Sequence, residues 1–391
     1  MAYSTIYLDT KGKSTPNSSA DRLNEVALFL LAAFFLVNIF DKIPIIGIPL
    51  DFFLLGVVVF LTILTLLLRK RIYVSIRVFS IFILLLVPAL LINLHDNGKL
   101  ARLLLYMLFF VLVTPNLFSS TKNNLVFCKF LSFLGVIASL ISLLFNEVQM
   151  DGRLVLFGSN PIWLSRFVSF TIVWAYVQLL NKKINIQKFL AIIIFPAIVM
   201  LRTLSLGPLL ALIIVTIVLS FQLLNKQNTV RFLKVTLIGL LLSIVLFLSL
   251  SDYQLSRIVG NEESIKSRTQ RLVLISESLS IIKEKPNGVG LGQFSKYSKL
   301  PHLAYPHNVV LEVTAELGWL MGIALMYLII DMYRVLHLKS KQNSDYMGIY
   351  SLTLLAIINS MVSGNMLSTK ELFLCIAYYA FLKNTIILKL K

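Results

Sequence analysis

The sequence predicts an all-α, polytopic membrane protein with about twelve transmembrane helices and one large outer loop between helices nine and ten. Hydrophobic residues make up 58% of the 391 residues, charged residues only 14%, and the mean hydropathy is +0.85. Soluble globular chains contain roughly 45–50% apolar and about 25% charged residues. The composition excludes a soluble enzyme and a disordered or fibrous protein, because apolar residues are too abundant and stand in long runs.

Long apolar runs occur along most of the chain. A helix that spans a membrane needs about 20 mostly apolar residues. Twelve runs approach this length: 26–41, 48–68, 74–93, 103–118, 125–145, 162–180, 186–201, 206–224, 232–250, 308–330, 346–362 and 372–388. We interpret 186–201 and 206–224 as a tight helical hairpin, because Gly207 and Pro208 mark a restart and a single helix would exceed the bilayer thickness.

The loop charges predict the orientation of these helices. With both termini in the cytoplasm, the inner segments hold most of the lysines and arginines, as the positive-inside rule requires. The same rule accounts for the net charge of +18, so nucleic-acid binding is not predicted. The chain then divides into a cytoplasmic tail (1–25), helices one to nine (26–250), the outer loop (251–306), and helices ten to twelve with a short tail (307–391).

The outer loop is expected to carry an amphipathic helix over 269–285. Its apolar residues recur at spacings of three and four, at Leu272, Ile275, Leu279 and Ile282. Pro286 ends this helix, and the glycine run 288–292 follows as a loop. We expect the helix to lie on the outer membrane face or on the helical bundle.

His307 is the candidate general base. It lies in Tyr305-Pro306-His307-Asn308, at the outer start of the tenth predicted helix. A neutral imidazole accepts a proton near pH 7. The alternative is that Asn308 caps the helix and His307 is an incidental residue of the membrane interface.

Arginines form a second group of candidates on the same side of the membrane. Arg268 and Arg271 open the loop helix, Arg202 lies at the tip of the hairpin, Arg153 precedes the sixth helix, and Arg166 lies inside it. A guanidinium binds phosphate through two parallel hydrogen bonds. An arginine at membrane depth usually faces a partner or a water-filled cavity. The alternative for Arg153, Arg202 and Arg271 is contact with lipid headgroups.

Other residues give weaker signals. Gly290 lies within the glycine run, where a bare backbone could approach a phosphate, although a plain turn is the alternative. Glu312 and Glu316 are four residues apart near the outer end of helix ten, and face either the site or the loop cations. Cys128 and Cys375 lie in apolar runs and are expected to be packing residues. No metal-binding or P-loop motif occurs in the sequence, so no metal or cofactor is predicted.

Three motifs follow one another between residues 270 and 322. Arg271 is followed by Pro286-Asn287-Gly288-Val289-Gly290-Leu291-Gly292-Gln293-Phe294, then by Tyr305-Pro306-His307-Asn308-Val309-Val310-Leu311-Glu312, then by Glu316-Leu317-Gly318-Trp319-Leu320-Met321-Gly322. Together they resemble the O-antigen ligase/polymerase superfamily. The family pattern runs from an arginine through a glycine-rich stretch to a His-Asn-x-x-Leu-Glu helix that ends in a glycine pair. The twelve predicted helices and the large loop extend the similarity over most of the chain.

The resemblance implies a glycosyltransferase of the bacterial inner membrane with its active site on the periplasmic face. Its donor and acceptor would be undecaprenyl-diphosphate-linked glycans within the membrane lipids, and a chain-length regulator is a candidate protein partner. His307 matches the family's essential histidine, Arg271 its loop arginine, and Arg202 the arginine near the turn between helices seven and eight. We predict His307 and Arg271 to be catalytic, and the predicted substrate-binding residues are Arg153, Arg202, Arg268, Gly290, Asn308 and Glu312.

The family contains two activities that use the same donor. Polymerases join lipid-linked repeat units, whereas ligases transfer the finished glycan to lipid A–core. The spacing between Gly318 and Gly322 and the Tyr-Pro-His-Asn motif favour the polymerase, with the ligase as the alternative. A lipid-linked oligosaccharide flippase is a third reading, but it predicts inverted repeats and charges near the membrane midplane that we do not find.

Overall fold

The structure of the chain is a computed structural model. This structure describes residues 18–36, 44–45, 48–69, 71–75, 77, 80–81, 83, 97–149, 152–223, 255–256, 259–260, 262–300, 305–366, 368–383 and 386–389. Most of the predicted run 74–93 and all of 232–250 lie outside these residues.

Helices make up most of the described part, which confirms the predicted all-α class. Those before the outer loop are α1 (Ser18–Leu36), α2 (Leu50–Arg69), α4 (Asn97–Leu117), α5 (Thr121–Phe145), α6 (Pro161–Leu180), α7 (Ile186–Arg202) and α8 (Leu206–Leu223). The later ones are α11 (Glu262–Glu284), α12 (Phe294–Tyr297), α13 (Val309–Leu317), α14 (Trp319–Gln342), the 3-10 helix η2 (Ser344–Tyr346), α15 (Met347–Val362) and α16 (Lys370–Lys383).

Six stretches within the described residues are long and apolar enough to cross a membrane. They are α2, α5, α6, α8, α14, and η2 together with α15. Two small antiparallel sheets accompany the helices. One joins β1 (Pro44–Ile45) to β2 (Ile48–Pro49), and the other joins β3 (Arg71–Val74) to β4 (Ile386–Lys389).

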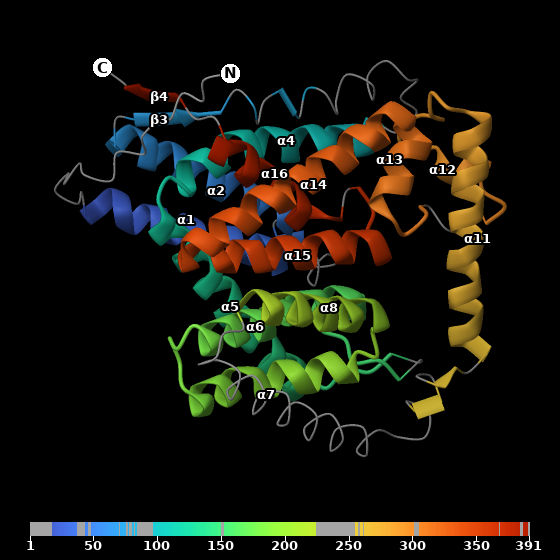
Figure 1. The fold of residues 1–391 in the computed structure, drawn as a ribbon, viewed down its shortest axis with the longest axis horizontal. Coiled ribbons are helices and arrows are strands. Elements are labelled where there is room, and N and C mark those ends of the chain that lie inside the picture. Colours follow the sequence, from blue (N-terminus) through green and yellow to red (C-terminus); the bar gives the residue numbers. More distant parts are fainter. Residues whose placement is uncertain are drawn as a thin grey trace.

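The long helices run roughly alongside one another, and α11 crosses one end of the bundle nearly at right angles to them (Figure 1). We call this the α11 end. Strands β3 and β4 lie toward the opposite end in the same view. At the α11 end, Arg166 of α6 contacts Ser363 after α15, and Asn308 before α13 contacts Met361. The segments predicted to be outer loops therefore meet at one end, although which side of a membrane this end faces stays a prediction.

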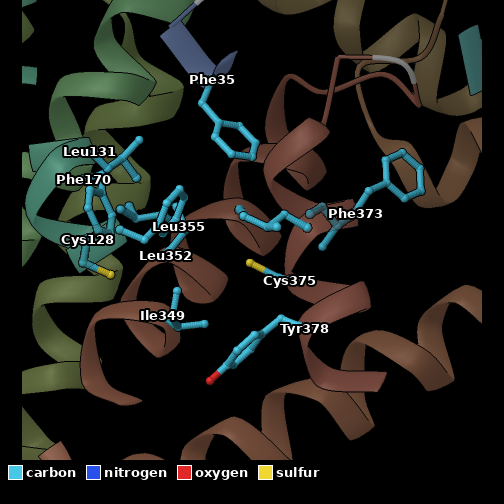
Figure 2. Packing of buried hydrophobic residues seen from close by; sticks show 14 of the residues in the cluster. Phe35, Cys128, Leu131, Phe170, Ile349, Leu352, Leu355, Phe373, Cys375 and Tyr378 are labelled. Carbon is cyan, nitrogen blue, oxygen red and sulfur yellow. The ribbon is translucent and has the colours of Figure 1, made fainter. Parts of the chain in front are cut away.

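The bundle is held together by a continuous apolar core. Figure 2 shows its packing where α5, α6, α15 and α16 meet, with Cys128 and Cys375 among apolar side chains. Both cysteines are free and only 1% exposed, so they are packing residues as predicted. Glycines allow some of the close approaches. A Cβ atom on Gly135 would lie 2.0 Å from Oγ1 of Thr171 on the neighbouring helix.

The predicted hairpin over 186–201 and 206–224 is confirmed, since α7 ends at Arg202 and α8 begins at Leu206. Two helices differ in extent from the predicted apolar runs 26–41 and 372–388. Helix α1 begins at Ser18 rather than at 26, because its polar first turns are stabilised by ion pairs: Asp21 with Arg69 at 2.8 Å, and Glu25 with Lys122 at 3.6 Å. The last predicted run, 372–388, ends as a helix at Lys383, because its β-branched tail pairs as β4 with β3.

The tenth predicted helix is broken at Gly318, which separates α13 from α14. The glycine run causes this break. Its Val289 N–H donates to the carbonyl of Ala315, and the Trp319 N–H donates to the carbonyl of Pro286, both at 3.0 Å. These bonds draw the chain out of helical conformation at Gly318, which has φ 92°.

The helix predicted over 269–285 is present as part of the longer α11, but its packing face differs from the expectation. The predicted stripe is largely exposed, with Leu272 68% and Leu279 56% accessible. Instead, Leu274 and Ile281 are buried against Phe294 of α12 and Ala315 of α13. Helix α11 is therefore attached to the bundle through α12 and α13.

Candidate active site

His307 is held in a strained backbone conformation just before α13. Its φ of 58° lies in the left-handed region, which only a small fraction of non-glycine residues adopt. The next residue, Asn308, caps α13, because its Oδ1 accepts hydrogen bonds from the N–H groups of Val310 and Leu311, each at 3.0 Å. The Asn308 Nδ2 donates to the Met361 carbonyl at 3.0 Å. Asn308 thus fixes the position from which the imidazole projects.

The imidazole of His307 is partly buried and has an unused nitrogen. Its Nδ1 is buried and has no hydrogen-bond partner among the described residues. Its ring centre lies 4.6 Å from that of Tyr305. Burial, followed by the charges of Arg271 and Arg166, lowers the pKa of His307 to about 4. The imidazole is therefore neutral at pH 7 and able to accept a proton.

Arg271 reaches this site from α11. Burial lowers the pKa of its guanidinium, and the nearby Tyr305 hydroxyl opposes that effect. An arginine side chain keeps its proton at neutral pH even when burial lowers its pKa, so the group stays charged. The structure thus brings the two residues that the sequence predicted as catalytic into electrostatic contact, although 36 positions separate them in the chain.

Arg166 of α6 is a second cation beside His307. It is 7% exposed, and its Nη2 donates to the Asn359 carbonyl at 2.9 Å and to the Ser363 hydroxyl at 2.6 Å. Its guanidinium carbon lies 4.6 Å from the ring centre of Trp163. The Nε is buried with no hydrogen-bond partner among the described residues. Sequence reasoning noted Arg166 as an arginine inside a helix but did not assign it to the site.

Arg153 and Arg202 lie at the turn between α7 and α8. The Arg153 Nε donates to the Thr203 carbonyl at 3.0 Å, and its Nη2 donates to the Ser205 hydroxyl at 2.9 Å. The Arg202 carbonyl accepts from the Leu154 N–H at 2.9 Å. These contacts fold the loop before α6 onto the hairpin. These contacts of Arg153 and Arg202 lie within the loop and the hairpin rather than at His307.

Three further predicted residues have defined positions. Arg268 lies on the exposed surface of α11, one turn before Arg271. The Gly290 N–H donates to the backbone carbonyl of Glu316 at 2.9 Å, so this amide is already used. Glu312 is 3% exposed, and its carboxylate accepts from the Met366 N–H at 2.7 Å.

The glycine run packs tightly against the end of α13. A Cβ on Gly288 would lie 2.5 Å from the Glu316 carbonyl oxygen, and Gly288 has φ 88°. The Glu316 carboxylate accepts from the Gly292 N–H at 2.8 Å and from the Phe294 N–H at 3.4 Å. Close approach of two backbones therefore requires glycine here.

Tyr305 joins the site to the loop between α15 and α16. Burial and the Glu312 carboxylate raise the pKa of its hydroxyl. The charge of Arg166, a side-chain hydrogen bond with Asn365, and the charge of Arg271 lower it.

Among the described residues there is no cluster of three or more His, Cys, Asp or Glu that could hold a metal ion. The charges that surround His307 in this part of the structure come chiefly from arginines.

The fold and the site define a helical membrane protein with a neutral histidine beside a buried arginine, Arg166, and a partly buried one, Arg271, at one end of its bundle. Residues 190–327 match the family model described as O-antigen ligase. This segment contains Arg202, Arg271 and His307, and the match supports the resemblance to the O-antigen ligase/polymerase superfamily that the motifs predicted. No curated protein matches the chain in a sequence search.

Proposed function

We propose that this chain is a glycosyltransferase of the bacterial inner membrane that polymerises undecaprenyl-diphosphate-linked oligosaccharide units on the periplasmic face. The observation that carries the proposal is the arrangement around His307: a neutral imidazole with an unused Nδ1, flanked by Arg271 and Arg166. The family match of residues 190–327 supports the same class of reaction.

The chemistry needs a base for the acceptor and positive charge for the leaving group. We propose that the acceptor hydroxyl attacks the anomeric carbon of the donor and that His307 takes its proton. The bond between the anomeric carbon and the diphosphate oxygen breaks, and the diphosphate leaves with the electron pair. Arg271 and Arg166 stabilise the negative charge that develops on this oxygen. The attack is in line with the leaving group and inverts the anomeric configuration.

A pKa of about 4 suits His307 before substrate binds, because it keeps the imidazole unprotonated. A bound diphosphate would offset the charges of both arginines and so raise the pKa of His307 toward its ordinary range. The base therefore strengthens when the donor is in place. No ATP is available on the periplasmic face, so in this proposal the activated diphosphate-linked donor supplies the driving force.

The remaining predicted residues surround this centre in the proposal. Arg202 and Arg268 contact the diphosphate or the glycan, since both carry guanidinium groups at the α11 end. Asn308 and Glu312 orient the start of α13, and Gly290 and Arg153 shape the flanking loops. The partners are the lipid-linked donor and acceptor and the surrounding lipids, with a chain-length regulator as a candidate protein partner. Both termini lie in the cytoplasm.

Replacement of His307 by alanine tests the proposal. In a host that lacks the chromosomal gene, His307→Ala is expected to abolish long-chain polymer on a gel while the protein stays at its normal level in the membrane. His337→Ala is the matched control, because His337 bonds to the Tyr350 hydroxyl at 3.0 Å and lies near the end of α14 that is away from α13. Normal polymer in the His307→Ala strain would refute the proposed base.

The second candidate is an O-antigen ligase, and the description of the matched family favours it. The two activities differ in the product that accumulates when the gene is deleted. Loss of a polymerase leaves lipid A–core that carries single repeat units. Loss of a ligase leaves bare core together with polymer that is still attached to undecaprenyl diphosphate. Gel analysis of the deletion strain distinguishes them.

A further inference from the structure

We propose that a buried ion pair between Lys370 and Asp51 positions the loop 363–369 and, through this loop, the groups around His307. The proposal rests on the proposed function, because glycosyl transfer is the reaction in which misplacement becomes visible. Lys370 and Asp51 are positioning residues in this proposal, and neither contacts His307.

The ion pair is almost completely enclosed. The Lys370 Nζ lies 3.7 Å from the Asp51 Oδ2, and the two side chains are 4% and 6% exposed. The Lys370 Nζ also lies 4.6 Å from the ring centre of Phe34 and 5.3 Å from that of Tyr106. The Tyr106 hydroxyl donates to the Asp51 Oδ2 at 3.0 Å. The pair therefore joins α16 to three helices from the N-terminal part of the chain.

A buried ion pair of this kind contributes little to the net free energy of unfolding. Removing two charges from water costs several kcal/mol each, and the attraction between them often does no more than offset that cost. Replacing a buried ion pair by well-packed apolar side chains is often neutral or stabilising. What the ion pair adds is a directional contact that fixes the start of α16 against α2, and this points to a role in positioning.

The start of α16 is continuous with a tightly bonded loop. Lys370 is the first residue of α16, and Thr369 before it donates from Oγ1 to the Asn365 carbonyl at 3.0 Å. The Ser368 N–H donates to the Asn365 Oδ1 at 2.7 Å. A Cβ on Gly364 would lie 2.5 Å from the Thr369 side chain, so the loop is also closely packed. A displacement of Lys370 is therefore transmitted to Asn365.

The same loop contacts the site at three points. The Ser363 hydroxyl accepts from Arg166 at 2.6 Å, and the Met366 N–H donates to Glu312 at 2.7 Å. Asn365 bonds to the side chain of Tyr305, whose ring centre lies 4.6 Å from that of His307 with the two rings tilted by 58°. The residue after Lys370, Glu371, is also close enough to Arg166 for their charges to interact. The loop thus touches both the cation and the segment that carries the base.

Helix α16 offers a matched control at its other end. Lys383 pairs with Asp331 at 2.5 Å and lies 5.3 Å from the ring centre of Tyr379. This second lysine–aspartate pair likewise tethers α16 and likewise lies beside an aromatic ring. It differs in being at the end away from His307, with side chains 32% and 18% exposed.

The test compares double variants that remove each pair without leaving one buried charge alone. Purified Asp51→Asn/Lys370→Met and Asp331→Asn/Lys383→Met proteins in lipid nanodiscs receive the undecaprenyl-diphosphate-linked repeat unit of their host. We expect the first variant to lose about 10- to 100-fold in kcat with KM changed less than about threefold, because misplaced catalytic groups slow the chemical step. The second variant is expected to keep kcat within about twofold of wild type. The single variant Lys370→Arg, which keeps the charge, is expected to retain more of the wild-type kcat than Asp51→Asn/Lys370→Met does.

Two outcomes would overturn the positioning role. One is wild-type kcat in Asp51→Asn/Lys370→Met, and the other is an equal loss of kcat in both double variants, which would indicate general destabilisation of α16. His307→Ala in the same assay separates this inference from the proposed function. If His307→Ala retains activity, the proposed function fails. If His307→Ala is inactive and Asp51→Asn/Lys370→Met is normal, only the positioning role fails.

Discussion

Replacement of Arg271 by glutamine is expected to raise the pKa of His307 and to move the acid limb of kcat/KM to higher pH. Burial is the largest cause of the lowered pKa of His307, followed by the charge of Arg271 and then that of Arg166. Glutamine is polar but uncharged. Because a nearby cation disfavours the imidazolium form, removing that cation raises the pKa.

The order of these causes bounds the effect. Together they lower the pKa of His307 from 6.5 to about 4. Arg271 contributes no more than burial does, so its removal recovers at most half of this interval, and the acid limb moves no higher than about pH 5. The pH dependence of kcat/KM reports groups of the free enzyme, so this limb is the one to compare. Turnover is also expected to fall by about 10²- to 10³-fold, because Arg271 no longer stabilises the departing diphosphate.

The assay is polymer formation by the purified protein in nanodiscs at subsaturating substrate, measured between pH 4 and pH 8. Arg268→Gln is the matched control, because it removes the same charge one turn earlier on α11, from an exposed position. The pH at which kcat/KM of Arg268→Gln falls in acid is expected to equal that of the wild type, even if its rate differs. An acid limb in Arg271→Gln that is unchanged, or shifted to lower pH, would refute the electrostatic coupling between α11 and His307.

Three further outcomes follow from packing. Gly288→Ala is expected to lower the amount of folded protein, because its Cβ would lie 2.5 Å from a backbone carbonyl oxygen. Gly158 has a φ of 63° but no atom within 4 Å of its Cβ position, so Gly158→Ala should cost only about 1 kcal/mol of unfolding free energy. Thermal unfolding in detergent compares the two. Glu316→Ala is expected to destabilise by about 2–4 kcal/mol by the same measurement, because it removes the carboxylate acceptor from the part-buried Gly292 N–H and the buried Phe294 N–H. Cys128 and Cys375 should react with a membrane-permeant maleimide only after denaturation, since both are 1% exposed, and labelling of the native protein would contradict the packing.

Local signals were sufficient to predict several parts of the fold. The α7–α8 hairpin follows from two long apolar runs with Gly207 and Pro208 between them. The break at Gly318 could not be predicted in this way. It arises because the glycine run, which lies earlier in the chain, pairs with the end of α13, and no local pattern around Gly318 reports that contact. The strand β4 was missed for a similar reason, since its partner β3 lies more than 300 residues away.

The candidate site likewise contains residues that the local sequence suggests and a residue that only distant contacts reveal. His307 and Arg271 stand in recognisable motifs, so the sequence alone was sufficient to name them as candidates. Arg166 does not, and only the packing of α6 against the end of α15 brings it to His307. A signal was present, because an arginine inside an apolar helix is costly unless it has a partner. The partner could not be named, since the Asn359 carbonyl and the Ser363 hydroxyl lie almost 200 residues further along the chain.

The glycine run and the Arg271 cation are linked through α11. Arg271 lies on a helix that is attached to the bundle by Leu274 and Ile281, which pack on α12 and α13. Helix α12 follows the glycine run directly, and the Glu316 carboxylate binds the amides of Gly292 and Phe294 at that junction. The run therefore acts as a scaffold: its small residues let α12 dock on α13, and this docking provides the surface on which α11 holds Arg271 near His307. A bulkier residue in the run would displace the cation while leaving the base in place, because Asn308 fixes His307 through separate contacts.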